Sequence, residues 1–267
     1  MDAAICVSTV WGWLTTVNFG GGEGAKDAHI RRIGMITSKR ILRDVQTMVS
    51  DELTSLGIYY TYQDTNMQKG QCLLIGPPDT PYACCPLLFS ITIPPTYPFM
   101  SPSVVFDTSD GMTRFHPNLY VGGKVCLSIL GTFSGPSWAT AMNIGTVFKS
   151  IFSLLNENPI QNEPGWESYT LTHVKARSYA DWVQYRLLRL TIRTWAVART
   201  DISKSQWAPF KDVFESDVWE TAWKSMRGVL EARVAQGDVE YAEIPYGMAG
   251  KTNWAGLLEE YTRASVQ

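Results

Sequence analysis

The chain has 267 residues, 45% of them hydrophobic, so it can build a substantial core and is not disordered throughout. Its 23 Lys and Arg residues face 25 Asp and Glu residues, and the formal net charge of -2 provides no positive field for a nucleic-acid backbone. We therefore expect a globular protein without a nucleic-acid partner, leaving room only for a local basic patch.

The five cysteines are odd in number and contain no C-x-x-C pair, which argues against a disulfide framework or a zinc site. Reduced thiols in the cytoplasm or nucleus fit this pattern best. We expect four of them to be small buried hydrophobes and one to carry chemistry. The cysteines are Cys6, Cys72, Cys84, Cys85 and Cys126, and the histidines that could assist them are His29, His116 and His173.

The first nineteen residues are apolar but carry Asp2 where a signal peptide has a basic start, so we do not expect secretion. No later run approaches the roughly 20 apolar residues of a membrane span, so we expect a soluble protein. The glycine-rich stretch 20–28 predicts a flexible linker. Residues 1–36 are accordingly predicted to be a flexible N-terminal segment.

Thr37 and Ser38 are predicted to cap a first helix, and Gly57 to stop it. Apolar residues recur at helical spacing between them, and the opposite face is basic. The apolar positions are Ile41, Val45, Met48, Val49, Leu53 and Leu56, and the basic positions are Lys39, Arg40 and Arg43.

Four short runs rich in β-branched and aromatic residues follow, separated by proline and glycine punctuation. This spacing predicts an antiparallel meander. The runs begin at residues 58, 71, 87 and 103.

The stretch 109–138 shows no period, and a loop of that length inside a compact domain is usually functional. A helix is predicted over 139–155. Three aromatic-rich helical patterns then suggest an extension packed on the domain rather than a tail. These patterns cover residues 179–197, 207–234 and 254–265.

The informative segment is FHPNLYVGGKVCLSIL, residues 115–130, in which a His-Pro-Asn turn lies eight residues ahead of a cysteine. It resembles the active-site signature of the ubiquitin-conjugating enzymes. The order of the surrounding pieces matches too: the basic first helix, GPPDTPY, YPFMSP, Trp138 and the helix after it. The segments GTFSGPSW and ENPIQNEPGWE are most similar to a long branch of the family that has its own C-terminal extension.

The resemblance implies an α+β ubiquitin-conjugating fold: a first helix, a four-stranded antiparallel meander and later helices, followed by an α-helical extension. It covers about residues 37–167, leaving 168–267 as the extension. It also implies that Cys126 accepts ubiquitin, or a ubiquitin-like protein, as a thioester and passes it to a lysine. The alternative for Cys126 is a buried inert thiol.

Three residues of the signature receive roles from the resemblance. Asn118 either donates its amide to the oxyanion formed during lysine attack or holds the loop by bonding backbone groups. His116 is expected to fix the turn rather than act as a base, and Pro117 to lock it.

The family has an acidic gate residue that orients the incoming lysine. The matching stretch leaves Asn162 or Glu163 at that position, and we favour Glu163 because Pro164 follows it as in the family. The alternative for Glu163 is an exposed loop carboxylate without a role.

Partner contacts also follow from the resemblance. The basic residues of the first helix are expected to meet the activating enzyme, and two loops a ligase. The first set is Lys39, Arg40 and Arg43, and the second is Phe99, Ala139, Thr140 and Ala141. The alternatives are a merely solvated helix face and a core Phe99.

The chain departs from the family at three places. Ser128 stands where many members have Asp, Cys84 and Cys85 replace a Gly-Gly pair, and 139–141 lacks Ser-Pro-Ala. These departures put the ligase preference in doubt.

The resemblance implies no metal or organic cofactor, since ATP is consumed by the activating enzyme. Expected partners are the modifier, an activating enzyme, a ligase and protein substrates, with no membrane partner. The rival function is a non-catalytic scaffold that binds ubiquitin or a ligase. A cysteine hydrolase is a weaker rival, because no His and carboxylate partners are recognisable. The extension either helps choose the activating enzyme or modifier, or only stabilises the fold.

Overall fold

The computed structural model describes the backbone of residues 25–266 and the side chains of residues 37–266. The chain divides into two compact units, residues 1–36 and 37–267. The apolar first nineteen residues, Cys6 and most of the glycine-rich stretch lie outside the described residues, and so do the side chains of 25–36. Among the helices that are described, none combines the length and the hydropathy needed to cross a bilayer.

The first helix, α1, covers Ala25–Met48 and begins earlier than the expected caps Thr37 and Ser38. That expectation was wrong, because Thr37 has a tertiary role. Its hydroxyl donates to the carbonyls of Pro95, at 3.0 Å, and Tyr97, at 2.8 Å. Residues 25–28 of the predicted linker are likewise helical.

The helix also ends earlier than predicted. A break at Ser50 separates α1 from the short α2, Asp51–Ser55. Gly57 still terminates the helical region, with a φ of 77° that favours glycine, and its N–H donates to the Thr54 carbonyl at 2.9 Å.

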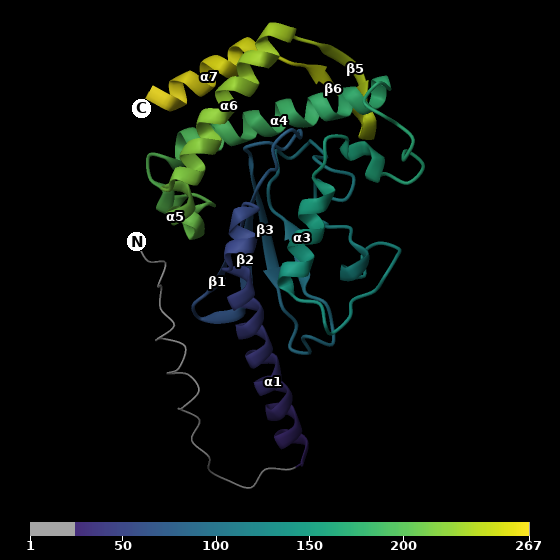
Figure 1. The fold of residues 1–267 in the computed structure, drawn as a ribbon, viewed down its shortest axis with the longest axis vertical. Helices are drawn as coiled ribbons and strands as arrows, with labels where there is room; N and C mark the ends of the chain where they lie inside the picture. Colours follow the sequence, from purple (N-terminus) through teal and green to yellow (C-terminus); the bar gives the residue numbers. More distant parts are fainter. Residues whose placement is uncertain (1–24, 267) are drawn as a thin grey trace. The chain divides into compact units, whose positions relative to one another are not determined.

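The four strands form one antiparallel sheet in the order β1-β2-β3-β4 (Figure 1), as the sequence predicted. Side chains on one face of the sheet align through Tyr60, Cys72, Phe89 and Phe106, which are register partners in turn. The strands are β1 Ile58–Gln63, β2 Asn66–Ile75, β3 Pro86–Thr92 and β4 Ser103–Phe106.

Helix α3, Ile144–Leu154, packs against this sheet, with the rings of Phe148 and Phe89 meeting edge to face at 5.9 Å. Its predicted start at residue 139 was wrong. Asn143 caps the helix, because its Oδ1 accepts the Thr146 N–H at 2.8 Å and the Thr146 hydroxyl accepts the Asn143 N–H. Residues 139–142 therefore form a loop.

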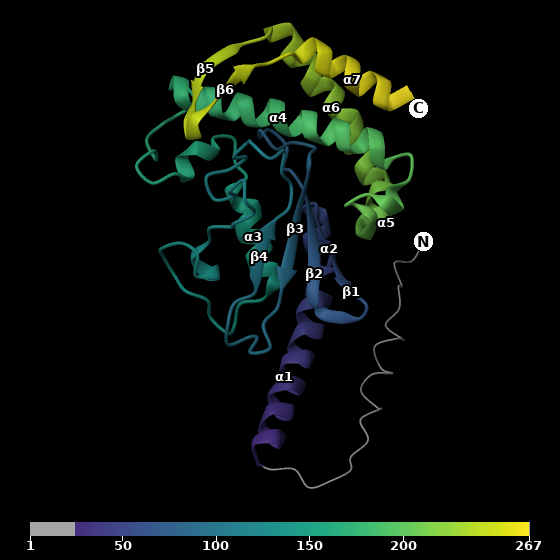
Figure 2. The same cartoon turned by 180° about the vertical axis from the view of Figure 1, so that it is seen from behind.

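The extension packs onto the sheet domain as expected, and it adds an unpredicted hairpin. Helix α4 lies along one end of the domain, with α7 and the hairpin against it (Figures 1 and 2). The pattern over 207–234 is interrupted by turns instead of forming one helix. The elements are α4 Val174–Ala198, α5 Lys211–Phe214, α6 Asp217–Gln236, β5 Glu240–Ile244, β6 Met248–Lys251 and α7 Trp254–Val266.

One continuous cluster of buried side chains runs from Ile41 to Ala264. Within the extension, the ring of Trp195 contacts four other aromatic rings, those of Trp207, Phe214, Trp219 and Trp223. Hydrophobic burial therefore joins the extension to the sheet domain.

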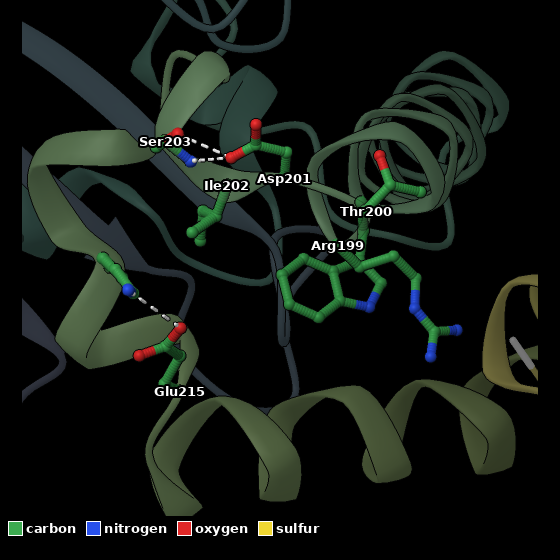
Figure 3. A pocket seen from close by; sticks show the side chains of 8 residues that line it. Arg199, Thr200, Asp201, Ile202, Ser203 and Glu215 are labelled. Carbon is green, nitrogen blue, oxygen red and sulfur yellow. Dashed lines mark hydrogen bonds and ion pairs between the residues drawn. The ribbon is translucent and has the colours of Figure 1, made fainter.

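A cavity of about 490 Å³ opens beside Trp195, between the end of α4 and α5 (Figure 3). Four of its polar side chains pair with one another. The Ser203 hydroxyl donates to Asp201 at 2.5 Å, and the Nζ of Lys211 lies 3.6 Å from the Glu215 carboxylate. The residues that line this cavity thus have structural roles in the packing of the extension.

Gly76 allows an unusually close approach after β2. A Cβ there would lie 1.9 Å from the carbonyl oxygen of Tyr82. The Tyr82 hydroxyl in turn donates to the Phe115 carbonyl at 2.8 Å, in the buried core. Gly76 thereby lets Tyr82 reach the segment that carries the His-Pro-Asn turn.

We predict that Gly76→Ala destabilises the protein by about 3 kcal/mol or more, because the new methyl must displace backbone. Gly228→Ala, at an exposed position of α6 with open space for a methyl, is the matched control. It should stabilise by about 0.5–1 kcal/mol through helix propensity. Chemical denaturation of both variants measures the two effects, and a small loss at Gly76 would contradict the close approach.

Candidate functional site

Cys126 lies between β4 and α3, where regular secondary structure is sparse and hydrogen bonds must place the thiol. Its N–H donates to the Asn118 carbonyl at 2.8 Å, and the Asn118 side-chain Nδ2 donates to the Cys126 carbonyl at 2.8 Å. The residue is only 5% exposed. The structure therefore brings together the two residues that the sequence separates by eight positions.

The His116 ring is buried and holds the turn. Its Nδ1 accepts the Asn118 N–H at 2.9 Å, so the neutral ring carries its proton on Nε2, 3.1 Å from the Leu154 carbonyl. Burial lowers the pKa of His116 to about 3, although the bond to Leu154 opposes the shift. A ring with both nitrogens engaged and so low a pKa is suited to holding a turn rather than accepting protons.

Asn118 is buried with one amide hydrogen on the Cys126 carbonyl, while its Oδ1 has no partner within the described residues. One Nδ2 hydrogen thus bonds the backbone of the cysteine loop, and for the second the described residues show no acceptor. The loop-holding bond is present, and the oxyanion role stays a prediction.

The two candidate gate residues point to different neighbours. Asn162 donates to the Pro159 carbonyl at 3.1 Å and lies 3.4 Å from His116 Nε2. Glu163 is half-buried, and its Oε2 accepts the Tyr246 hydroxyl at 2.6 Å. Of Asn162 and Glu163, only Glu163 has a carboxylate, and Tyr246 holds that carboxylate by a hydrogen bond.

Sequence reasoning missed Arg114, which links the turn to the extension. Its guanidinium lies 3.5 Å from the ring centre of Tyr120 and 4.4 Å from that of Tyr246, and it donates to the Pro117 carbonyl. The Tyr179 hydroxyl on α4 donates to the Arg114 carbonyl at 2.7 Å. The position of Arg114 directly before the signature was the available signal.

A second missed group follows the cysteine. The Thr132 hydroxyl accepts the Leu127 N–H at 2.9 Å and lies 2.7 Å from the Val125 carbonyl. Gly135, at a φ of 132°, packs so closely that an added Cβ would lie 3.0 Å from the Cβ of Ser128. Thr132 and Gly135 both belong to GTFSGPSW, so this segment packs against the cysteine loop and bonds to its backbone.

The three basic residues of α1 are not equivalent. Lys39 and Arg43 are exposed. Arg40 turns inward, where its Nε donates to the buried Asp44 at 2.8 Å and its Nη1 to the Thr140 carbonyl at 2.7 Å. Arg40 therefore ties α1 to the 139–142 loop.

The two expected ligase loops lie side by side, because the Trp138 indole donates to the Pro98 carbonyl at 2.7 Å. Phe99 is 68% exposed, so it is not a core residue. The segment 139–141 is exposed as well. The structure thus brings the two loops together at the bond between Trp138 and Pro98, with Phe99 and 139–141 exposed.

The remaining described cysteines are free thiols away from these bonds. Cys72 and Cys85 are buried, Cys84 is half-buried, and burial raises the pKa of all three. In the part of the chain that the structure describes, no three His, Cys, Asp or Glu side chains gather as metal ligands would.

A comparison with protein families matches residues 40–186 to the ubiquitin-conjugating enzyme family. The chain belongs to the ubiquitin-conjugating enzyme family. That match covers more than half of the chain and includes the signature, the meander and α3.

The chain is similar to ubiquitin-conjugating enzyme E2 Z of Danio rerio, at 34% identity over 82% of this chain and 65% of the relative. It is 38% identical to E2 Z of Homo sapiens over 57% of this chain and 43% of the relative. A probable ubiquitin-conjugating enzyme protein 17 of Caenorhabditis elegans is 34% identical over 67% of this chain and 26% of the relative. The chain thus spans less than two thirds of the length of these relatives, and the long branch indicated by its sequence is E2 Z.

We predict that acid destabilises the protein in part through His116. Below its unfolded pKa of 6.5, the unfolded chain takes up a proton that the folded ring refuses until about pH 3. Stability should therefore fall by up to about 1.4 kcal/mol per pH unit as the pH drops through this window.

Chemical denaturation between pH 7 and pH 4 checks this dependence. His116→Gln should be less stable at neutral pH but lose less on acidification. Equal slopes for the wild type and His116→Gln would show that His116 is not held neutral.

Proposed function

We propose that this chain is an active conjugating enzyme that carries ubiquitin, or a ubiquitin-like protein, as a thioester on Cys126. The observation that carries the proposal is the reciprocal pair of 2.8 Å hydrogen bonds between Asn118 and Cys126. These bonds fix the backbone of Cys126 against Asn118, which supports a pairing of nucleophile and amide donor. Membership of the family and likeness to E2 Z support the same activity.

Charging requires a thiolate and a carbonyl. The Cys126 thiolate attacks the carbonyl carbon of the modifier's thioester on the activating enzyme, and the new C–S bond replaces the old one as the activating enzyme's thiolate leaves. Thiol exchange proceeds through the thiolate fraction of the attacking thiol and does not require a dedicated base.

Discharge transfers the acyl group to nitrogen. A lysine amine that has given one proton to solvent attacks the thioester carbonyl, and Asn118 stabilises the oxyanion with its second amide hydrogen. Collapse breaks the C–S bond, releases the Cys126 thiolate and leaves an amide once the nitrogen loses another proton. We assign Glu163 to the orientation of that amine.

The partners follow from this chemistry: the modifier, an activating enzyme, a ligase and protein substrates. Exposed Lys39 and Arg43 suit an acidic surface of the activating enzyme, while Arg40 would act indirectly by shaping the loop it bonds. Exposed Phe99 beside 139–141 suits a ligase loop. A cytoplasmic or nuclear location fits the reduced thiols.

The extension has two proposed roles. Its shared core with the sheet domain supports a stabilising role. Selection of the activating enzyme or modifier is the other, and it is tested by charging with two activating enzymes after exposed residues of the extension are substituted. The rival function, a scaffold without catalysis, is tested below.

We predict that incubation with activating enzyme, ATP and ubiquitin yields a thiol-sensitive adduct on a non-reducing gel. Cys126→Ser should form a more stable oxyester, because an ester resists amines and thiols, and Cys126→Ala should form none. Cys84→Ala and Cys85→Ala are the matched controls and should charge normally. Charging of Cys84 or Cys85 would refute the assignment, and no adduct with several activating enzymes would favour the scaffold.

We predict that Asn118→Ala slows lysine discharge by about 10²–10³ and slows charging less, because one oxyanion donor is lost. Single-turnover rates of the two steps measure the difference, with thermal melting as the check on folding. An equal loss in both steps with the fold intact would assign Asn118 to holding the loop alone.

A further inference from the structure

Tyr246 brings the extension into the active-site region. It lies between β5 and β6, 83 residues after Glu163, and its hydroxyl donates to Glu163 Oε2 at 2.6 Å. Burial, followed by the bond to Glu163, raises the pKa of Tyr246, so the hydroxyl keeps its proton and acts as a donor. A charge-assisted bond of this length is among the stronger hydrogen bonds in proteins.

The tyrosine is itself fixed from several sides. Its ring lies 4.4 Å from the Arg114 guanidinium and meets the Tyr179 ring edge to face at 5.5 Å. Its φ of 67° places a large side chain in the left-handed region, which non-glycine residues adopt rarely. Packing must compensate for this conformation, and such compensated outliers gather at functional sites.

The same cluster connects Glu163 to the His-Pro-Asn turn. Arg114, beneath the Tyr246 ring, donates to the Pro117 carbonyl and is held through its own carbonyl by Tyr179. A continuous path of contacts therefore runs from the gate carboxylate through the hairpin to the turn that places Asn118.

We infer that Tyr246 is a positioning residue that holds the Glu163 carboxylate for the acceptor lysine. The inference rests on the proposed function and deepens it by assigning part of the acceptor site to the extension. With Oε2 held by the tyrosine, Oε1 stays free to accept from the lysine nitrogen.

The hydrogen bond from the lysine nitrogen to Glu163 Oε1 only orients the amine, and no atom of Glu163 is transferred. The lysine lone pair forms the C–N bond, the C–S bond breaks to the Cys126 thiolate, and the two protons lost by nitrogen pass to solvent. Without Tyr246, the Glu163 side chain would lose conformational entropy each time a lysine binds. The hydrogen bond to Tyr246 fixes the carboxylate beforehand and so lowers that cost.

The test follows discharge of full-length protein already charged with ubiquitin on Cys126. Free lysine serves as one acceptor, and hydroxylamine as another that is uncharged near neutral pH. Tyr246→Phe removes only the hydroxyl. Tyr241→Phe is the matched control, since it lies on the same hairpin and its hydroxyl donates to Asp181, on α4, at 3.1 Å.

Tyr246→Phe should slow discharge to lysine about tenfold through the limiting rate, while hydroxylamine discharge, charging and melting stay within about twofold or 2 °C of wild type. Tyr241→Phe should match wild type with both acceptors. In a Glu163→Gln background, Tyr246→Phe should have little further effect, because the two residues act as one unit.

Unchanged or faster lysine discharge by Tyr246→Phe would overturn the inference and leave the proposed function standing. Equal slowing with both acceptors, or full additivity with Glu163→Gln, would overturn it in favour of a purely structural role. A wild-type chain that no activating enzyme charges would overturn the proposed function, and this inference with it.

Discussion

The arrangement of the site depends on the reciprocal bonds between Asn118 and Cys126. Because few regular elements surround the cysteine, these two bonds fix the backbone of Cys126 against that of Asn118. They require Asn118 to be fixed, and the neutral His116 fixes it by accepting its N–H while donating to the end of α3. A short chain of hydrogen bonds thereby connects Cys126 to the end of α3, and burial at this place disfavours a charged histidine.

The aromatic residues of the extension serve two separate ends. Around Trp195 they bury apolar surface, which stabilises the attachment of α5 and α6 to α4. Near the turn, Tyr246 instead contacts the guanidinium of Arg114, as does Tyr120 of the sheet domain. Cation–π attraction to these rings holds the guanidinium where it donates to the Pro117 carbonyl of the turn.

The meander and the long helices could be located from the sequence because the spacing of apolar residues follows which side chains are buried in a strand or a helix. Sequence reasoning misplaced the ends of α1 and α3, since Thr37 bonds distant carbonyls and the cap at Asn143 overrides the apolar pattern before it. The His-Pro-Asn turn and Cys126 could be paired because their spacing resembles the family's signature. Tyr246 could not be, because its hydroxyl meets Glu163 across 83 residues, and nothing local in the sequence encodes a tertiary contact of that range.

The late position of Tyr246 in the chain bears on the order in which the site is completed during synthesis. Cys126 leaves the ribosome first, and Tyr246 follows 120 residues later. At about 5–20 residues per second, that interval lasts roughly 6–24 s. Throughout that interval the hydroxyl that bonds Glu163 is missing from the nascent chain. The contacts of Tyr246 with Glu163 and Arg114 can therefore form only after the residues around Cys126 have been synthesised.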